Sequence, residues 1–395
     1  MAGPLKGVRV LDFTWNLAGP YCTMILSDLG AEVIKIENPE GGDPARKNFP
    51  SIKGRSSYFL SVNRGKKSVT INLRHPRGRE SVLEIAKRCD VMVENFRPGV
   101  LDRLALGYSA IREVNPKIIY AACSGFGQNS PYAHRPAYDV IVQGMGGTLS
   151  ITGEAEGRPA RVGFSIGDIG GGIFMAIGIL SALHQREKNG KGQMVEVSML
   201  DCQIAFLENA FARFFATGEI PKPIGTRHPV HTPFQAFPTK DGFIVLAAAH
   251  EQWWQKLCEV LDRPDLLKDD RFKDDKSRTQ NHAQLEVILS EITRGRNTAD
   301  WVATMEQNDI PCGPVNTVAQ VASDPHTVAR NMIIQVKDSK DINFKVVNSP
   351  IKLSENPIHI EKASPDLGEH TDEVLAEILE LSKDQISDLR FIKAI

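Results

Sequence analysis

The stretch VRVLDFTWNLAGPYCTMILSDLGAEVIKIE, residues 8–37, has the pattern of a strand, a helix and a second strand. Residues 8–13 and 31–37 are short runs rich in valine and isoleucine, which is typical of buried strands. The segment between them, residues 20–30, has helical character and ends at Gly30. A unit of this kind predicts two parallel strands joined by a crossover helix.

The same alternation continues through the first half of the chain. Further strands are predicted over residues 68–73, 90–95 and 118–127, and a helix over 77–88. This order predicts an α/β fold with a mostly parallel sheet. Ligands of such sheets bind beyond the carboxyl ends of the strands. The candidate binding loops are therefore FTWNLAGP (13–20), ENFRPG (94–99) and SGFGQNSP (124–131).

The second half of the chain suggests two domains. A long apolar helix is expected from about residue 168, whereas residues 218–242 are rich in proline and glycine, which indicates a linker or a long functional loop. A strand over 243–249 and helical segments to about residue 310 predict a smaller α+β unit. A strand pair and a helix from about residue 372 end the chain. We predict a large domain over 1–200 and 330–395, a small domain over 225–320, and linkers over 200–225 and 320–330.

The composition argues against several classes of protein. A formal net charge of −1 provides no basic field for nucleic acid. No apolar run approaches the roughly 18–20 residues that span a bilayer, and the opening MAGPLKGVRVLDF lacks the features of a secretion signal. The six cysteines contain no C-x-x-C pair, which favours free thiols in a reducing compartment. We therefore expect a cytoplasmic protein without a membrane partner.

Common cofactor and metal signatures are missing from the sequence. GFGQNS (125–130) and GMGGTL (144–149) fail the full glycine pattern of dinucleotide folds, and no P-loop occurs. Cys22 and Cys123 are weaker candidates for a nucleophile than for buried thiols. His228 and His231 form the only close histidine pair, and no carboxylate or thiol stands beside them in the sequence. No metal site is expected there.

The segment VGFSIGDIGGGIFMAIG (162–178) places Asp168 between Gly167 and the triplet Gly170–Gly172 at the start of a helix. One interpretation is a helix cap, a common role for aspartate. Three successive glycines then have no explanation, since each weakens a helix by roughly 1 kcal/mol relative to alanine. The other interpretation is a nucleophilic carboxylate, with glycines that admit a substrate and N–H groups that hold developing negative charge. The residues alone leave both open.

Basic residues cluster near two predicted strand ends, where a phosphate-bearing cofactor would lie. Arginine forks bind phosphate oxygens, and lysine supplies a point charge. Solvated surface charge is the alternative, and for Lys66 and Lys67 it is the favoured one. The two clusters are Arg64, Lys66, Lys67 and Arg74, and Arg97 and Arg103.

Several segments together resemble the class III CoA-transferases, the formyl-CoA transferase or CaiB/BaiF family. The resemblance runs in order from residue 4 to about residue 380. It is carried mainly by residues 4–46, VNRGKKSVTINL (62–73), DVMVENFRPGVLDRLALGY (90–108), IIYAACSGFGQNSPY (118–132), PAYDVIVQGMGG (136–147) and GDIGGGIFMAIGILSALHQREKNGKGQ (167–193).

The resemblance implies that Asp168 is the catalytic aspartate. It would attack a donor acyl-CoA to form a mixed anhydride, the CoA thiolate would return to give an aspartyl thioester, and an acceptor carboxylate would collect the CoA. No tightly bound cofactor or metal is implied; acyl-CoA is the substrate. The implied fold is a Rossmann-like large domain with a smaller α+β domain, in an interlocked homodimer. The implied CoA contacts are Leu17, Ala18, Asn38, Ile71, Asn72, Leu73, Arg74, Asn95, Phe96, Arg97, Arg103, Pro136, Ala137, Tyr138 and Asp139.

Two of these positions depart from formyl-CoA transferase. Leu17 stands where that enzyme has a glutamine, which puts formate and oxalate specificity in doubt. Asn38 replaces an arginine, so Arg74 or Arg103 would carry more of the phosphate charge. The glycine-rich lid of that enzyme is also missing, and residues 225–235 occupy its region. For the substrates we hypothesise succinyl-CoA and a small dicarboxylic acid, with Arg227 and His228 as acceptor contacts.

Two other functions remain as alternatives. An α-methylacyl-CoA racemase needs an acid and a base on opposite faces of the α-carbon. Racemases of this family have a histidine where this chain has Tyr138, and tyrosine is a weak acid–base partner near neutral pH. A non-catalytic CoA-binding protein is the other alternative, and the presence of Asp168 argues against it.

Overall fold

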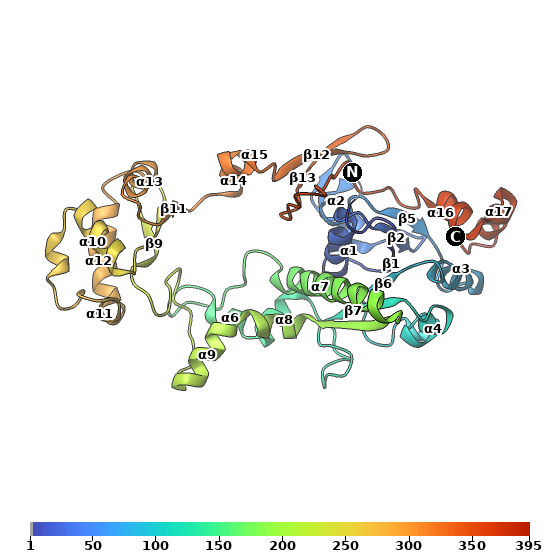
Figure 1. The fold of residues 1–395 in the computed structure, drawn as a ribbon, viewed down its shortest axis with the longest axis horizontal. Coiled ribbons are helices and arrows are strands. Elements are labelled where there is room, and N and C mark those ends of the chain that lie inside the picture. The colour runs from blue at the N-terminus through green and yellow to red at the C-terminus, as the bar shows by residue number, and fades with distance from the viewer. Residues whose placement is uncertain (1–2) are drawn as a thin grey trace. The chain divides into compact units, whose positions relative to one another are not determined.

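The computed structural model describes residues 3–395, and the chain divides into two compact units (Figure 1). The first unit contains the residues up to Leu149 together with Arg161–Glu219 and Val328–Ile395. The second contains Ser150–Ala160 and Ile220–Thr327. Residues 150–160, which the sequence analysis placed in the large domain, thus group with the second unit.

The first unit is built on a sheet of six parallel strands in the order β5-β2-β1-β6-β7-β8. Counted along the chain these strands run 3-2-1-4-5-6, the order of doubly wound dinucleotide-binding folds. The predicted parallel α/β sheet is confirmed. The strand order reverses between β1 and β6, so a ligand crevice is expected at their carboxyl ends. The strands are β1 (Arg9–Asp12), β2 (Glu32–Glu37), β5 (Lys67–Thr70), β6 (Val91–Glu94), β7 (Ile119–Ser124) and β8 (Gln193–Ser198).

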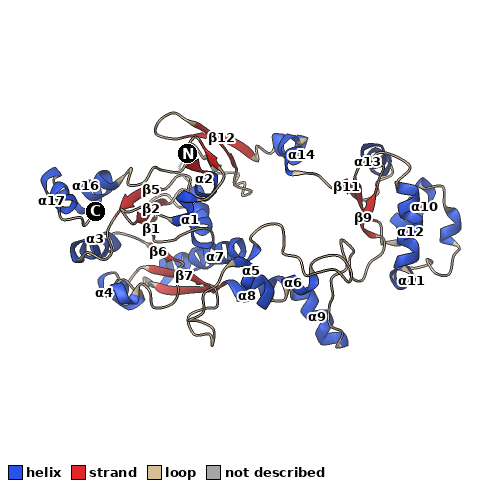
Figure 2. Cartoon of the chain, turned by 180° about the vertical axis from the view of Figure 1, so that it is seen from behind, coloured by secondary structure: helices blue, strands red, loops and turns tan. Residues whose placement is uncertain are grey.

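Helices cover both faces of this sheet (Figure 2). One face packs against α3 (Pro76–Ala86), α4 (Tyr108–Val114), α16 (Thr371–Leu379) and α17 (Lys383–Phe391). The other packs against α1 (Ala18–Asp28), α5 (Asp139–Met145), α7 (Ile166–Asn189) and α8 (Met199–Phe206). Burial on both faces explains why the strands read as continuous apolar runs in the sequence.

Smaller elements complete the first unit. A hairpin of β12 (Ile333–Lys337) and β13 (Asn343–Val347) packs its apolar side chains against α2 (Ser57–Val62). The others are η1 (Pro44–Lys47), β3 (Ser51–Ile52), β4 (Arg55–Ser56), η2 (Asp102–Leu104) and α9 (Glu208–Thr217), while α6 (Thr148–Ile151) and α15 (Pro325–Ala329) lie at the unit boundaries.

Helix α7 is long and apolar enough to cross a membrane by length and composition. The sequence analysis expected no segment of that kind, because glycines and a few polar residues interrupt the apolar run without lowering its mean hydropathy. Half of the apolar window is buried in the first unit, where α7 packs against α1, β7 and β8. Met175, Ile179 and Leu183 belong to the core. This packing is that of a core helix in a folded domain.

The second unit has its own antiparallel sheet and core. Strand β10 (Phe243–Ala247) lies between β9 (Phe234–Pro238) and β11 (Cys312–Pro314). Its largest fully buried side chains are Trp254, Arg278, Phe237 and Phe272. Its helices are α10 (Glu251–Val260), η3 (Pro264–Leu267), α11 (Asp275–Gln280), α12 (His282–Thr293), α13 (Thr298–Gln307) and α14 (Val318–Ser323).

Candidate active site

A cavity of about 230 Å³ lies at the carboxyl ends of β1, β6 and β7, where the strand order reverses. This is the crevice that the topology predicts. The loops after these three strands contribute most of its wall, and β7, α1, α2, α7 and α8 contribute the rest. It is lined by Asn16, Leu17, Ala18, Tyr58, Asn95, Phe96, Arg97, Pro98, Cys123, Ser124, Gly125, Ala133, Arg135, Ala137, Tyr138, Asp168 and Met199.

The loops after β1 and β6 are held together. The Asn95 side chain accepts a hydrogen bond from Trp15 N and donates one to Trp15 O, both at 2.8 Å. The Trp15 and Phe96 rings pack edge to face at 4.9 Å. Glu94, the last residue of β6, accepts a hydrogen bond from Phe96 N at 2.7 Å. Asn95 lies in the predicted site, but its side chain holds protein backbone there.

Asp168 is the third residue of α7, and Ser165 occupies the cap position. Because Asp168 lies inside the first turn of the helix, the interpretation of this residue as a helix cap is wrong. The Gly167 N–H is taken by Asp139, whose Oδ1 accepts it at 2.8 Å. That N–H is therefore not free for a substrate oxyanion. Asp168 itself faces the cavity.

The pKa of Asp168 is raised to about 7, chiefly because the carboxyl is largely buried and also because Asp139 lies nearby. A carboxylate attacks as the anion, so the group is divided between active and inactive forms near neutral pH. A raised pKa also makes the carboxylate more basic and hence a better nucleophile. Perturbed carboxyls of this kind gather in functional clefts.

On the covalent route that the family resemblance implies, the rate of the first acyl transfer to Asp168 should rise as the pH increases through about 7. Below that pKa, each pH unit should change the rate by about tenfold. Asp139→Asn removes the neighbouring negative charge and should move the midpoint to lower pH. Presteady-state measurements between pH 5.5 and 8.5 on both proteins test this. An unmoved midpoint in the variant would contradict the assigned effect of Asp139.

The glycine triplet has a packing role that the sequence did not indicate. A methyl group at Gly170 would meet the Phe206 ring at 2.5 Å, and one at Gly171 would meet Cys123 Sγ at 3.0 Å. At Gly172 it would meet the carbonyl oxygen of Ala18 at 2.7 Å. The glycines thus allow α7 to approach its neighbours closely. The predicted role of admitting a substrate to the backbone is not supported at these three positions.

The structure brings about half of the predicted site residues together. Leu17, Ala18, Asn95, Phe96, Arg97, Ala137, Tyr138 and Asp168 line the cavity. Asp139 lies directly behind it through its bond to Gly167. The remaining predicted contacts are not part of its wall: Asn38, Ile71, Asn72, Leu73, Arg74, Arg103 and Pro136.

Two of the residues outside the wall have structural roles. Ile71 is fully buried in the core. The Asn72 side chain donates a hydrogen bond to Lys393 O at 3.0 Å and accepts one from Arg74 N at 3.0 Å. Arg74 and Arg103 are exposed and remain candidates for phosphate contacts outside the cavity.

The sequence analysis missed Tyr58 and Arg135 as cavity residues. Tyr58 comes from the short helix α2, and burial together with the charge of Asp168 raises its pKa to about 12. Its hydroxyl is therefore a neutral donor at the site. Arg135 stacks over the Tyr132 ring at 4.3 Å. A tyrosine or arginine in a loop carries no sequence signal of this role, although Arg135 stands directly before the PAYD segment.

The two cations of the cavity are available for a ligand. Among the residues that the structure describes, no acidic side chain forms an ion pair with Arg97 or Arg135. In contrast, Lys66 is buried against Asp12 at 3.1 Å, and Lys67 pairs with Glu32 and Glu373. Arg64 pairs with Asp28 at 2.6 Å. The basic cluster around residues 64–67 therefore serves the fold.

The structure supports no thiol nucleophile. All six cysteines are free. Cys123 lines the cavity, but burial raises the pKa of its thiol well above the ordinary value. Burial also raises the pKa of Cys22. Both thiols are neutral at physiological pH, and Asp168 is the nucleophile candidate of the cavity.

The histidine pair of the second unit has a carboxylate beside it after all. Asp275 lies 2.7 Å from His231 Nδ1, and the His228 ring stacks on those of His231 and Phe234. The carboxylate comes from α11, far along the chain, so the sequence did not show it. No group of three or more metal-ligating side chains occurs among residues 3–395. Arg227 is half-buried in the same unit, where burial lowers its pKa.

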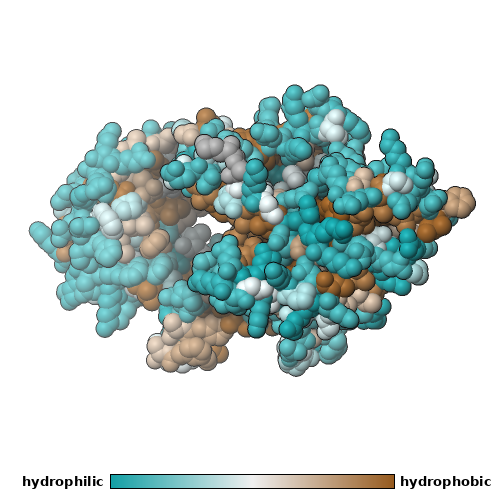
Figure 3. All heavy atoms as spheres, turned by 45° about the vertical axis from the view of Figure 1, so that its right-hand side comes forward, coloured by the Kyte–Doolittle hydropathy of each residue, from teal (hydrophilic) through white to brown (hydrophobic). Residues whose placement is uncertain are grey.

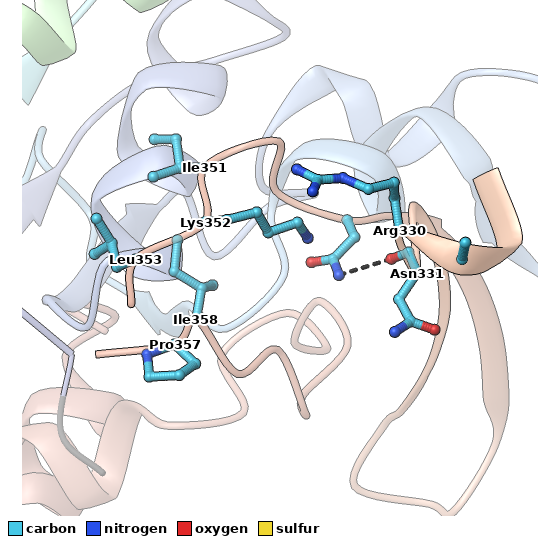
Figure 4. A pocket seen from close by; sticks show the side chains of 9 residues that line it. Arg330, Asn331, Ile351, Lys352, Leu353, Pro357 and Ile358 are labelled. Atoms are coloured by element: carbon cyan, nitrogen blue, oxygen red, sulfur yellow. Dashed lines mark hydrogen bonds between the residues drawn. The ribbon is translucent and has the colours of Figure 1, made fainter. Parts of the chain in front are cut away.

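A second cavity of about 350 Å³ lies beside the β12–β13 hairpin (Figure 4). Asn348 bridges across its wall to Asn331 O at 2.8 Å, and Arg330 and Lys352 supply its charge. Apolar side chains complete the lining, among them Ile351, Leu353, Pro357 and Ile358. None of the described residues in its wall is a carboxylate, thiol or histidine, so this cavity offers no group for covalent or acid–base chemistry.

The known proteins that are similar to this chain point to one family. A profile of CoA-transferase family III matches residues 5–371. The acetyl-CoA:oxalate CoA-transferase of Acetobacter aceti is 42% identical over 93% of this chain and 94% of its own length. The succinyl-CoA:glutarate CoA-transferase of Mus musculus is 38% identical over 98% of this chain and 89% of its own. A solved CaiB/BaiF family protein from Brucella suis has a TM-score of 0.87 at 37% identity, covering 96% of this chain and 100% of its own.

Proposed function

The chain belongs to CoA-transferase family III and is a CoA-transferase, and we propose that it moves CoA from succinyl-CoA to a small dicarboxylic acid through covalent intermediates on Asp168. The observation that carries the proposal is the position of Asp168. It is a partly buried carboxyl with a raised pKa, facing a cavity at the switch point of the sheet. Covalent catalysis divides one difficult exchange into easier acyl transfers.

The proposed route has four steps. An Asp168 carboxylate oxygen attacks the thioester carbonyl, the C–S bond breaks, and an aspartyl anhydride and CoA thiolate result. The thiolate attacks the aspartyl carbonyl, which releases the donor acid and leaves an aspartyl-CoA thioester. The acceptor carboxylate attacks this thioester and gives a second anhydride with CoA thiolate. The thiolate then attacks the acceptor acyl carbon, which forms the new acyl-CoA and restores Asp168.

Trapping the aspartyl intermediate tests this route. The protein is incubated with succinyl-CoA and treated with hydroxylamine or borohydride, and the peptide around Asp168 is analysed by mass spectrometry. We expect a hydroxamate or a reduced side chain at Asp168 and an unmodified peptide in Asp168→Ala. Failure of every acyl-CoA in a panel to modify the peptide would overturn the covalent mechanism.

Arg97 should bind a phosphate group of CoA, because it is exposed at the cavity and has no acidic partner among the described residues. A charge-assisted hydrogen bond contributes about 1.5–3 kcal/mol, so Arg97→Gln should raise the KM for acyl-CoA by about tenfold or more. The kcat should change less. Arg77→Gln, an exposed arginine paired with Glu80, is the control and should leave both constants unchanged. Equal effects of the two substitutions would contradict this role of Arg97.

The names of the relatives support a dicarboxylic acceptor. The two curated relatives are named for transfer to oxalate and to glutarate. Leu17 lines the cavity and is apolar, as the sequence indicated, so we favour glutarate-sized acids over oxalate. A screen of dicarboxylates with succinyl-CoA, with butyrate as the monocarboxylate control, decides the acceptor class. Arg227→Ala tests the hypothesis that Arg227 binds the second carboxylate of the acceptor. An unchanged KM for dicarboxylates would reject that hypothesis.

The racemase alternative is not favoured by the cavity. None of the described residues that line it is a histidine, and burial keeps the Tyr58 hydroxyl a weak acid by raising its pKa. A racemase needs two groups that exchange a proton near neutral pH. Release of the α-proton of a branched acyl-CoA into solvent is the measurement that would reverse this choice.

We further propose that the protein is a homodimer. Large apolar side chains are exposed along α7, α8 and α9, and Figure 3 shows hydrophobic atoms gathered on a projection at the lower edge, at the height of α9 in Figure 1. Exposed apolar surface of this kind marks interaction sites. Light scattering after size exclusion should give twice the chain mass. The residues are Ile173, Phe174, Ile177, Ile204, Phe206, Phe214 and Phe215.

A further inference from the structure

Four charged side chains are buried together beneath the wall of the cavity. Asp12 and Lys35 are fully buried neighbours in the register of β1 and β2, and Asp43 is fully buried as well. Lys35 pairs with Asp43 at 3.0 Å, and Lys66 pairs with Asp12 at 3.1 Å. Burying charges is costly unless each is paired and hydrogen-bonded. A cluster of this kind needs an explanation beyond stability.

Three of these groups also hold the loop that follows β1. Lys35 Nζ donates a hydrogen bond to Thr14 O at 2.5 Å, and Asp12 accepts two from the Thr14 amide and hydroxyl at 2.8 and 2.6 Å. Asp43 Oδ1 accepts one from Asn16 N at 3.1 Å. Together with the bonds of Asn95 to Trp15, three successive residues of this loop are fixed by side chains.

The loop has reason to be held, because Asn16 has a φ of 61°. This left-handed conformation is uncommon outside glycine, although asparagine tolerates it better than most residues. Asn16 and the next two residues, Leu17 and Ala18, line the cavity with Asp168. The carbonyl of Ala18 in turn meets α7 at Gly172. The loop is thus fixed from below by charge and from the side by the helix that carries the nucleophile.

We propose that Asp43 is a positioning residue for the CoA-transfer site: its side-chain oxygen accepts from Asn16 N and so fixes Asn16, Leu17 and Ala18 where the thioester meets Asp168, while Lys35 neutralises the buried charge of Asp43. This inference rests on the proposed function. Lys35 remains an ammonium, since burial alone would lower its pKa but the carboxylates of Asp12, Asp43 and Glu37 raise it. Neither Lys35 nor Asp43 lines the cavity, so both act through the loop.

Two double variants separate positioning from simple stability. Lys35→Met with Asp43→Asn removes both charges but keeps an oxygen that accepts from Asn16 N. Lys35→Met with Asp43→Leu removes both charges and the acceptor. We expect the first to form the Asp168 adduct within about threefold of the wild-type rate and the second to be slower by about tenfold or more, because small displacements of a site cost large factors in rate. Equal rates in the two variants would overturn the proposal.

The Arg64–Asp28 pair provides a matched control. It is a buried ion pair of the same unit at 2.6 Å, and Arg64 also donates to Val347 O at 2.7 Å, away from the cavity wall. Arg64→Met should lower the melting temperature. At temperatures where the variant is still folded, its rate of adduct formation should differ from wild type by less than about twofold. A rate loss as large as that of the double variant with Asp43→Leu would show that any buried pair has this effect and would overturn the proposal.

Hydrogen exchange reports on the order of the loop without requiring CoA transfer, so it tests the positioning role separately from the proposed function. Hydrogen exchange measured by mass spectrometry on peptides covering residues 13–19 should be faster in the double variant with Asp43→Leu than in the one with Asp43→Asn. Unchanged exchange in both would contradict the positioning role. If the wild-type protein forms no adduct with any acyl-CoA but the exchange differs as expected, the proposed function fails and the ordering of the loop by the Asp43 side chain stands.

Discussion

Replacing Asp168 by alanine should reduce CoA transfer by about 10⁴-fold or more, because the proposed covalent route has no other acceptor for the acyl group. The described residues of the cavity offer no substitute nucleophile, since burial raises the pKa of the Cys123 thiol and keeps it neutral. Binding of CoA should be nearly unchanged, because the cations and loops of the wall remain. Single-turnover assays with succinyl-CoA measure the loss, and calorimetry with CoA measures the affinity.

Two charge-removing variants, Asp201→Asn and Asp168→Asn, complete this test of Asp168. Asp201→Asn changes an exposed acid in the first turn of α8, outside the cavity wall, and should keep full activity. Asp168→Asn should be inactive but more stable above pH 7. The folded-state pKa of about 7 exceeds the ordinary value of 3.8, so the folded protein binds this proton more tightly and loses stability as the pH rises between them. A residual rate of Asp168→Ala or Asp168→Asn near that of wild type would contradict the proposed role of Asp168 as nucleophile.

Gly172→Ala should lower both stability and activity. The added methyl group would lie 2.7 Å from the carbonyl oxygen of Ala18 and 3.2 Å from Cys22 N, so α1 and α7 must move apart. Overpacking costs about 1–3 kcal/mol, and the gain of about 1 kcal/mol in helix propensity offsets only part of it. Because Ala18 and Asp168 line the same cavity from these two helices, we expect a rate loss of about 10–100-fold.

A helical glycine with ordinary surroundings provides the comparison. Gly144→Ala in α5 would place its methyl group 3.4 Å from Leu149 Cδ1, which is normal van der Waals contact. It should keep its melting temperature and its rate. Thermal unfolding and transfer assays on the two variants test the contrast. Indistinguishable behaviour would show that the close approach at Gly172 is not required.

The parallel sheet could be predicted from the sequence because its evidence is local. Each strand is a short apolar run, and the helices between strands are long enough to show their own pattern. The predicted strand over 8–13 is observed as Arg9–Asp12, and that over 31–37 as Glu32–Glu37. The carboxyl-end loops also follow from topology, which is why Leu17, Phe96 and Arg97 lie where they were expected.

What could not be predicted depends on contacts between distant residues. Lys66 was expected to be a solvated surface charge, with a phosphate contact as the alternative. It is instead buried against Asp12, and nothing local in the sequence distinguishes these cases. Tyr58 reaches the cavity from a six-residue helix with no motif of its own. The sequence could not decide whether Asp168 caps the helix. The structure excludes that role because Ser165 occupies the cap position.

The position of α16 and α17 has a consequence for biosynthesis. These helices cover one face of a sheet whose strands all lie before residue 199, and Val374, Leu375 and Leu389 share a core with Leu11 and Ile34. The ribosome delivers them after every strand that they cover. During translation this face of the sheet is therefore covered only by α3 and α4 and stays partly open, while the second unit, formed mostly by Ile220–Thr327, already has its full core. We expect the nascent chain to need shielding by chaperones until α16 and α17 emerge and cover the rest of the face.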